Sequence, residues 1–312
     1  MRIGLDVAQQ RMPWSELASR AQFADEAGFD GIWGFDHFQP MYGSGPGECF
    51  EGNTTLAALS GITRRARLGL LVTGMTYRHP SVFAAEAITI DHASGGRYEL
   101  AYGAAWFDAE HRALGIPFAP TGARVAAFEE AVQVVKGLLT TDGFSFDGRY
   151  YQLHDATLRP RPVQQPHPPF WIGATGPRML GVVARHADVW HAFGPTQVLT
   201  PMSEQVSELA TAAGRDPASI RRAGSVSLDG DLDAVRRTID GWRDAGFDYL
   251  IAGWPGAGPP PGGGPGGASA SGTAVPGPSG SSRVAAAALM LTSTPRTCTP
   301  CRRASPIRLA GE

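Results

Sequence analysis

Short apolar runs alternate with longer amphipathic stretches along residues 1–255. Each run holds four to seven residues, which is the length of a buried strand, and turn residues separate it from the next stretch. Eight of these runs occur, at residues 2–7, 30–35, 67–73, 98–103, 170–174, 188–192, 221–226 and 249–252. Because strands that alternate with helices pair in parallel, the pattern predicts eight βα units.

Three of the stretches between the runs carry apolar residues at helical spacing. They lie at residues 14–24, 125–139 and 232–242. We expect each apolar face to point inward onto the sheet, with Trp14 and Leu232 included. Gly246 stands where the third helix should end.

Eight βα units in about 250 residues match a closed (β/α)8 TIM barrel of the α/β class. An open, doubly wound sheet usually has fewer strands and a glycine fingerprint after the first strand, which residues 6–10 lack. Two alternating runs flank Asp147 and Gly148, a turn signal of β-hairpins. We therefore expect a hairpin inserted before the fifth strand.

The composition changes sharply near residue 255. Residues 256–312 hold 11 Gly and 9 Pro in 57 positions and no aromatic residue, too little apolar surface to offset the entropy of ordering. We expect a barrel domain at 1–255 and a disordered, low-complexity tail at 256–312 in place of the last helix. Without that helix, residues 249–252 should expose apolar surface.

The basic residues are 26 Arg and the single Lys136, a bias expected of GC-rich coding. GC-rich DNA read out of frame yields the residue types of the tail, so we hypothesise a frameshifted C-terminus. The tail carries five Arg against Glu312, or +4, which leaves −6 on the body of a chain whose net charge is −2. An acidic body without a basic stripe argues against nucleic-acid binding.

Several other classes of protein lose support from the sequence. No run approaches the roughly 18 apolar residues of a membrane span and no signal peptide opens the chain, so we expect a cytoplasmic protein that does not enter a membrane. Three cysteines are too few for a disulfide framework. Asp188 and His191 lie on opposite faces of a predicted strand, so no metal site is predicted. No P-loop, nucleophile elbow or dinucleotide fingerprint occurs.

Function in such a barrel lies at the carboxyl ends of the strands. Asp36 and His37 end the second predicted strand. A histidine titrates near neutrality and can move a proton at a reacting centre, and a neighbouring carboxylate can orient it. A histidine that only caps the strand is the alternative, and the position at the barrel mouth favours the chemical role.

Small residues end the other strands, where a ligand can approach the backbone. Gly74 follows the third predicted strand, and Gly103 ends the fourth. Residues 173–176 follow the fifth and open a helix near Pro177, whose free N–H groups, with Arg178, suit an anion. Ordinary loop glycines and a turn without an anion are the alternatives.

Five segments together resemble the luciferase-like monooxygenase superfamily. They are Asp-His-Phe-Gln-Pro at 36–40, Thr-Gly-Met-Thr-Tyr-Arg-His-Pro at 73–80, Ser-Gly-Gly-Arg at 94–97, Trp-Phe-Asp-Ala-Glu-His-Arg-Ala-Leu-Gly at 106–115 and Ile-Gly-Ala-Thr-Gly at 172–176. The first looks like the strand-two motif of deazaflavin-dependent glucose-6-phosphate dehydrogenases, which use coenzyme F420. The resemblance covers residues 1–253 and implies a (β/α)8 barrel with an insertion, a ring system at its mouth, and hydride transfer assisted by a strand-two histidine.

The same resemblance implies a set of site residues, with His37 as the catalytic one and no metal. The cofactor-binding residues would be Asp36, His37, Thr73, Gly74, Met75, Gly103, Ala104, Gly173, Ala174, Thr175, Gly176 and Arg178. Met41, Trp106 and His191 would line the substrate pocket, and a non-prolyl cis peptide would join Gly74 to Met75. Trp106 stands where the dehydrogenases have a catalytic glutamate, which argues against glucose-6-phosphate as the substrate.

Three functions follow as alternatives. The first is a deazaflavin-dependent oxidoreductase that transfers a hydride between coenzyme F420 and a small organic substrate. The second is an FMN-dependent monooxygenase that uses O2 and a partner flavin reductase. The third is an inactive or flavin-binding barrel without turnover. The expected partners are a small-molecule substrate and, in a homodimer, a second copy of the chain.

Overall fold

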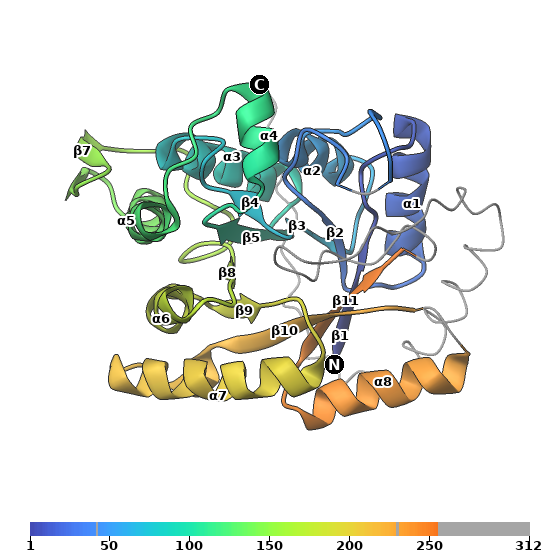
Figure 1. The fold of residues 1–312 in the computed structure, drawn as a ribbon. Coiled ribbons are helices and arrows are strands. Elements are labelled where there is room, and N and C mark those ends of the chain that lie inside the picture. Colours follow the sequence, from blue (N-terminus) through green and yellow to red (C-terminus); the bar gives the residue numbers. More distant parts are fainter. Residues whose placement is uncertain (42, 229–230, 255–312) are drawn as a thin grey trace, which may run out of the picture.

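The computed structural model describes residues 1–41, 43–228 and 231–254, and in it eight parallel strands close into a barrel (Figure 1). The strands are β1 (Arg2–Asp6), β2 (Gly31–Gly34), β3 (Arg67–Leu70), β5 (Tyr98–Gly103), β8 (Phe170–Gly173), β9 (Val189–His191), β10 (Arg221–Val226) and β11 (Tyr249–Gly253). Each pairs with the next in this order, and β11 pairs back with β1. The predicted (β/α)8 barrel is confirmed, because each apolar run contributes one strand.

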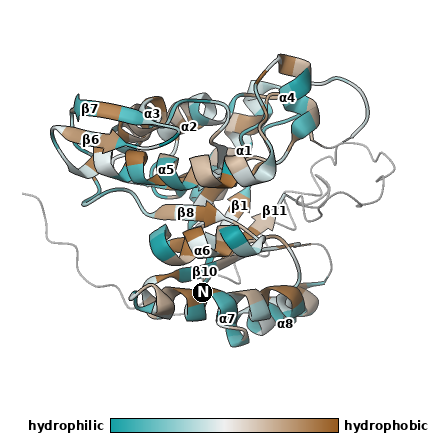
Figure 2. Ribbon diagram, turned by 60° about the vertical axis from the view of Figure 1, so that its left-hand side comes forward, coloured by the Kyte–Doolittle hydropathy of each residue, from teal (hydrophilic) through white to brown (hydrophobic). Residues whose placement is uncertain are grey.

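Helices cover the outside of the barrel. They are α1 (Trp14–Glu26), α2 (Gly52–Ser60), α3 (Pro80–Ala93), α5 (Thr121–Thr140), α6 (Pro177–His186), α7 (Thr196–Ala212) and α8 (Leu232–Asp244). A short helix, α4 (Asp108–Leu114), and a 3-10 turn, η1 (Pro217–Ser219), lie in the connections. In Figure 2, α7 and α8 carry both hydrophilic and hydrophobic residues, as helices with one buried face do.

The helices predicted from periodicity are confirmed as α1, α5 and α8. Phe128 and Val132 of α5, for example, are fully buried. Trp14 and Leu232 are exceptions, with 40% and 36% of their surface exposed. Each is the first residue of its helix, and Trp14 packs edge-on against Phe50 instead of on the sheet.

Large aromatic side chains fill the inside of the barrel. Trp33, Trp171 and Tyr249 are fully buried there. The ring centroids of Trp33 and Trp171 are 4.6 Å apart, and Trp33 Nε1 donates to the Tyr249 hydroxyl at 3.2 Å. A Cβ at Gly4 or Gly69 would come within 2.4 or 2.5 Å of the Trp33 ring, so these glycines make room for it. Below the mouth, the barrel is therefore a packed core.

A hairpin is inserted before the fifth barrel strand. It consists of β6 (Phe144–Asp147) and β7 (Gln152–Ala156) and lies between α5 and β8, which confirms the predicted insertion.

The third strand is shorter than predicted: β3 ends at Leu70, and a two-residue strand, β4 (Thr73–Gly74), continues beside β5. A cis peptide bond joins Leu71 to Val72 between these two strands. The predicted cis bond at Gly74–Met75 is therefore wrong, since Gly74 already pairs regularly with β5.

The predicted tail at 256–312, the domain boundary at residue 255 and the frameshift hypothesis lie outside the described residues. The exposed apolar seam expected at residues 249–252 is not found, because these residues are at most 2% exposed. Leu250 and Ala252 belong to an apolar cluster that also contains Leu17 of α1 and Ile239 of α8. Within the part of the chain that the structure describes, no helix is long and apolar enough to cross a membrane.

The close approach of Trp33 to Gly69 generates a stability prediction. Gly69→Ala should lower the free energy of unfolding by about 1–3 kcal/mol, because the new methyl group overpacks a ring that Trp171 and Tyr249 hold in place. Gly241→Ala in α8 is the control: nothing lies within 4 Å of its added Cβ, so it should stabilise by up to about 1 kcal/mol. Urea unfolding measures both, and a Gly69→Ala variant as stable as the parent would contradict the packing described.

Candidate active site at the barrel mouth

The carboxyl ends of the strands form the mouth of the barrel, above the aromatic core. Inward-facing residues lower in the barrel are buried, whereas Asp6, Val72, Gly173, Ser225 and Gly253 at this end are partly exposed. The ends of β2, β4, β5 and β8 bring nine of the residues predicted at the cofactor to this mouth: Asp36, His37, Thr73, Gly74, Met75, Gly103, Ala104, Gly173 and Ala174. The strand-end residues that the sequence singled out therefore share one end of the barrel.

His37 lies just beyond β2, only 8% exposed, inside a ring of aromatic side chains. The centroids of Trp106 and Phe107 lie 5.8 and 5.5 Å from its own, both edge-on. His37 Nδ1 lies 3.0 Å from a carboxylate oxygen of Glu110. Among the described residues, Nε2 has no hydrogen-bond partner, so this is the nitrogen left for a ligand.

The carboxylate that orients His37 is Glu110 of α4, not its neighbour Asp36 as the sequence suggested. Glu110 is fully buried and accepts hydrogen bonds from the backbone N–H groups of Phe38 and Gln39 at 2.8 and 2.9 Å. Burial raises its pKa, but the hydrogen bonds from His37, Tyr77 and Phe38 outweigh that effect and lower the pKa to about 2. Glu110 is therefore an anion at neutral pH.

The side chain of Asp36, predicted at the cofactor, is instead enclosed by protein. Its oxygens accept from Arg78 at 2.6 and 3.1 Å and from the Gly74 N–H at 2.8 Å, and the side chain has no exposed surface. Burial lowers the pKa of Arg78, but its contacts with Asp36, Glu86 and Glu51 outweigh this and raise the pKa. Asp36 thus attaches the end of β2 to β4 and to the loop after it, and neither of its oxygens is free for a ligand.

The predicted glycines at the mouth leave room for a neighbouring side chain. A Cβ at Gly103 would lie 2.4 Å from Val72 Cγ2, and one at Gly173 would lie 3.1 Å from Val72 Cγ1. Val72 therefore lies across the ends of β5 and β8 and is partly exposed at the mouth. Thr73 is buried, and its hydroxyl donates to Asn53 at 3.5 Å, so only its backbone is left for a ligand.

The other predicted cofactor residues, Thr175, Gly176 and Arg178, are exposed at the start of α6. Gly176 is the N-cap and makes no side-chain cap bond, so the first-turn N–H groups of α6 lack a side-chain acceptor. A Cβ at Gly122 would lie 3.2 Å from Arg178 Nη1, which places the start of α5 beside that of α6. This corner can receive an anion.

The three residues predicted in the substrate pocket occupy different levels of the mouth. Trp106 is 59% exposed and stacks on Phe107, while Met41 is half-buried and its N–H donates to Gln10 at 2.7 Å. His191 lies deep, with Nε2 3.1 Å from the Ser225 hydroxyl. Burial lowers the pKa of His191 to about 3, so the ring is neutral.

Asp6, at the end of β1, is a mouth residue that the sequence reasoning missed. One carboxylate oxygen accepts from the Ala8 N–H at 2.9 Å, and no ion pair is found for it within the described residues. Burial raises the pKa to about 6, against smaller lowering effects of Ala8 and Arg20. The sequence signal that could have identified it is an acidic residue at the carboxyl end of an apolar strand.

No group of three or more His, Cys, Asp or Glu among the described residues is placed to hold a metal ion.

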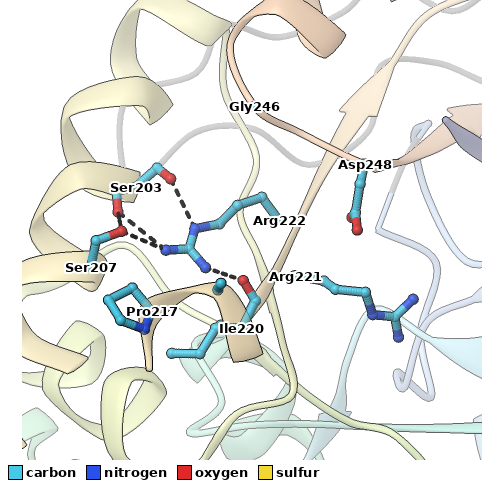
Figure 3. A pocket seen from close by; sticks show the side chains of 9 residues that line it. Ser203, Ser207, Pro217, Ile220, Arg221, Arg222, Gly246 and Asp248 are labelled. Carbon is cyan, nitrogen blue, oxygen red and sulfur yellow. Dashed lines mark hydrogen bonds between the residues drawn. The ribbon is translucent and has the colours of Figure 1, made fainter. Parts of the chain in front are cut away.

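A separate hollow lies at the opposite end of the barrel, at the amino ends of β10 and β11 (Figure 3). Arg222 points into it, but its guanidinium donates to Ser203 Oγ at 2.8 Å, to Ser207 Oγ at 2.9 Å and to the Ile220 carbonyl. These bonds attach α7 to β10. Arg222 is thus a structural residue.

The raised pKa of Asp6 generates a pH-dependent prediction. A carboxyl with a higher pKa in the folded state stabilises the fold fully below pH 4, and this contribution is lost as the pH rises through about 6. From pH 4 to pH 7, the unfolding free energy of Asp6→Asn should therefore rise relative to the parent by roughly 1–3 kcal/mol. Urea unfolding at the two pH values measures this, and a difference that does not change with pH would contradict the raised pKa of Asp6.

Comparison with known proteins places this chain in a family. The sequence pattern of the luciferase-like monooxygenases matches residues 1–250. An F420-dependent glucose-6-phosphate dehydrogenase from Kineococcus radiotolerans is 30% identical over 240 residues, 76% of this chain and 70% of that one. An FMNH(2)-dependent dimethylsulfone monooxygenase from Pseudomonas putida is 30% identical over 188 residues, 60% of this chain and 51% of that one. This chain thus spans about half the length of the monooxygenase it matches.

The solved structures agree with the sequence match. An F420-dependent secondary alcohol dehydrogenase in complex with an F420-acetone adduct has a TM-score of 0.72 at 18% identity, over 81% of this chain and 92% of that one. At this identity the likeness concerns the fold. With the family pattern matched over residues 1–250, the chain belongs to the luciferase-like monooxygenase family.

Proposed function

We propose that this protein is a deazaflavin-dependent oxidoreductase that transfers a hydride between coenzyme F420 and a small organic substrate. The observation that carries the proposal is His37 at the barrel mouth, with Nδ1 held by a buried anionic carboxylate and Nε2 without a partner among the described residues. Such a histidine can take or give the proton that accompanies hydride transfer. The F420-dependent relatives support the cofactor.

The residues around the mouth fit a flat ring with a phosphate-bearing side chain. Val72, Gly173 and the backbone of residues 74–75, 103–104 and 174 would contact the ring. Thr175, Gly176 and Arg178, at the exposed start of α6, would hold the phosphate. When bound, the deazaflavin supplies a ring carbon that accepts or donates a hydride.

The substrate side of the mouth would be formed by Trp106 and Met41 above His37. Trp106 offers a large exposed apolar face next to the His37 ring, which suits a small organic substrate. As in the sequence-based expectation, Trp106 at this position argues against glucose-6-phosphate. A homodimer and a cytoplasmic location stay predictions.

An FMN-dependent monooxygenase is the second candidate, because a 30% identical relative is named as FMNH(2)-dependent. It would need O2 and electrons from a partner flavin reductase. Substrate-dependent oxygen consumption in the presence of reduced FMN supports this candidate, and turnover with F420 under anaerobic conditions supports the first. A barrel that binds a flavin but lacks turnover with either cofactor would match the third alternative.

If His37 handles the proton, His37→Asn should lower turnover with F420 by roughly a hundredfold or more and leave the affinity for the cofactor nearly unchanged. The asparagine amide keeps a polar group of similar size at this position but cannot exchange a proton near neutral pH. Steady-state rates and cofactor titration on the same preparations separate the two effects. Unchanged turnover would remove His37 from the mechanism.

If Arg178 holds the cofactor phosphate, Arg178→Ala should weaken F420 binding by roughly tenfold or more, because a charge-assisted hydrogen bond is lost. Its affinity should also depend less steeply on salt than that of the parent. Arg243→Ala is the matched control: it removes the same charge from an exposed position in the last turn of α8. Equal affinities of Arg178→Ala and Arg243→Ala would place the phosphate elsewhere.

A further inference from the structure

We propose that Glu110 and Tyr77 are positioning residues that make His37 a proton acceptor at Nε2. Glu110 keeps the proton of the neutral ring on Nδ1, and Tyr77 weakens the hold of Glu110 on that proton. The consequence for catalysis rests on the proposed function, whereas the tautomer of His37 is a property of the protein alone.

The bonding of Glu110 leaves one arrangement for neutral His37. One oxygen, Oε1, accepts the N–H groups of Phe38 and Gln39, and the other, Oε2, accepts the Tyr77 hydroxyl at 2.5 Å and lies 3.0 Å from His37 Nδ1. Glu110 is an anion, so Oε2 has no proton to give to the imidazole. Nδ1 must therefore be the fourth donor to this carboxylate, and the lone pair of the neutral ring lies on Nε2.

Tyr77 competes with His37 for the same carboxylate oxygen. Burial and the bond to Glu110 raise the pKa of Tyr77, so its hydroxyl remains a donor at every pH of interest. The Tyr77 ring is held in place by stacking on the His111 ring, with the two ring centroids 4.8 Å apart. His111 Nε2 in turn lies 2.6 Å from the Thr76 hydroxyl. A second donor spreads the charge of Oε2 over two hydrogen bonds and reduces the share that stabilises a protonated His37.

The remaining charged and titratable groups near His37 leave Glu110 as its direct electrostatic partner. Asp36 is adjacent in sequence, but its carboxylate is paired with Arg78. Cys49 donates from Sγ to the His37 carbonyl at 3.4 Å, and burial raises the pKa of this thiol to about 12, so it carries no charge. Within the described residues, Glu110 is the one anion hydrogen-bonded to the His37 ring.

This arrangement assigns the proton step of the proposed reaction. A substrate hydroxyl gives its proton to Nε2, so an O–H bond breaks and an N–H bond forms. The resulting imidazolium is stabilised by the Glu110 carboxylate. In the opposite direction the imidazolium returns the proton to the substrate oxygen.

Histidine 15N NMR on the protein without cofactor tests the proposal, with the His37 signals assigned by their absence in His37→Asn. The parent should show neutral His37 with its proton on Nδ1. Glu110→Gln removes the negative charge but keeps an oxygen for the Phe38 and Gln39 N–H groups, and should move the pH midpoint of His37 protonation down by roughly one to three units. Tyr77→Phe removes the competing donor and should move it up.

Arg112→Gln is the control, because it removes an exposed ion pair with Asp108 on the same helix as Glu110 and leaves all four donors to Glu110 in place. Its His37 titration should match that of the parent. A proton on Nε2 in the parent, or variants that shift in the same direction, would overturn the proposal. If Glu110→Gln does not fold, the upward shift of Tyr77→Phe decides it. If the NMR results hold and F420 supports no turnover, the proposed function fails and the positioning roles stand.

Discussion

The mouth of this barrel depends on one buried carboxylate. Glu110 reaches from α4 to the loop after β2, where it bonds two backbone N–H groups and His37, and to the loop after β4, where it bonds Tyr77. The cost of burying an anion is offset because four donors surround it. The same contacts that make the charge tolerable therefore fix the loops that carry the candidate chemistry.

The inside of the mouth and its rim differ in the charge they favour. Burial drives both Asp6 and His191 toward their uncharged forms, raising the pKa of the acid to about 6 and lowering that of the imidazole to about 3. Surroundings with this property suit an uncharged ring. The exposed Arg178 and the uncapped start of α6 lie where a phosphate can stay partly hydrated. A flavin-type cofactor has this division, with a flat ring at one end and an anionic chain at the other.

Local pattern was enough to predict the barrel and its helices, and not enough to predict the contacts within the site. Apolar runs and helical spacing depend on nearby residues, and so the eight strands and the buried face of α5 were predictable. Glu110 lies in a seven-residue helix with no clear apolar face, 73 positions from His37 in the chain, and only the folded loops bring the two together. Asp36 was assigned to the cofactor because it adjoins His37 in sequence, yet Arg78 encloses its carboxylate. Proximity in sequence therefore did not predict that Glu110, and not Asp36, contacts the His37 ring.

If the proposed function is right, the mouth binds a deazaflavin in preference to FMN. Fluorescence titration of the purified protein with F420 and with FMN, under identical salt and pH, tests it most directly. We expect a Kd for F420 at least about tenfold below that for FMN, or about 1.4 kcal/mol in binding free energy. Tighter binding of FMN, or no saturable binding of either cofactor, would contradict it.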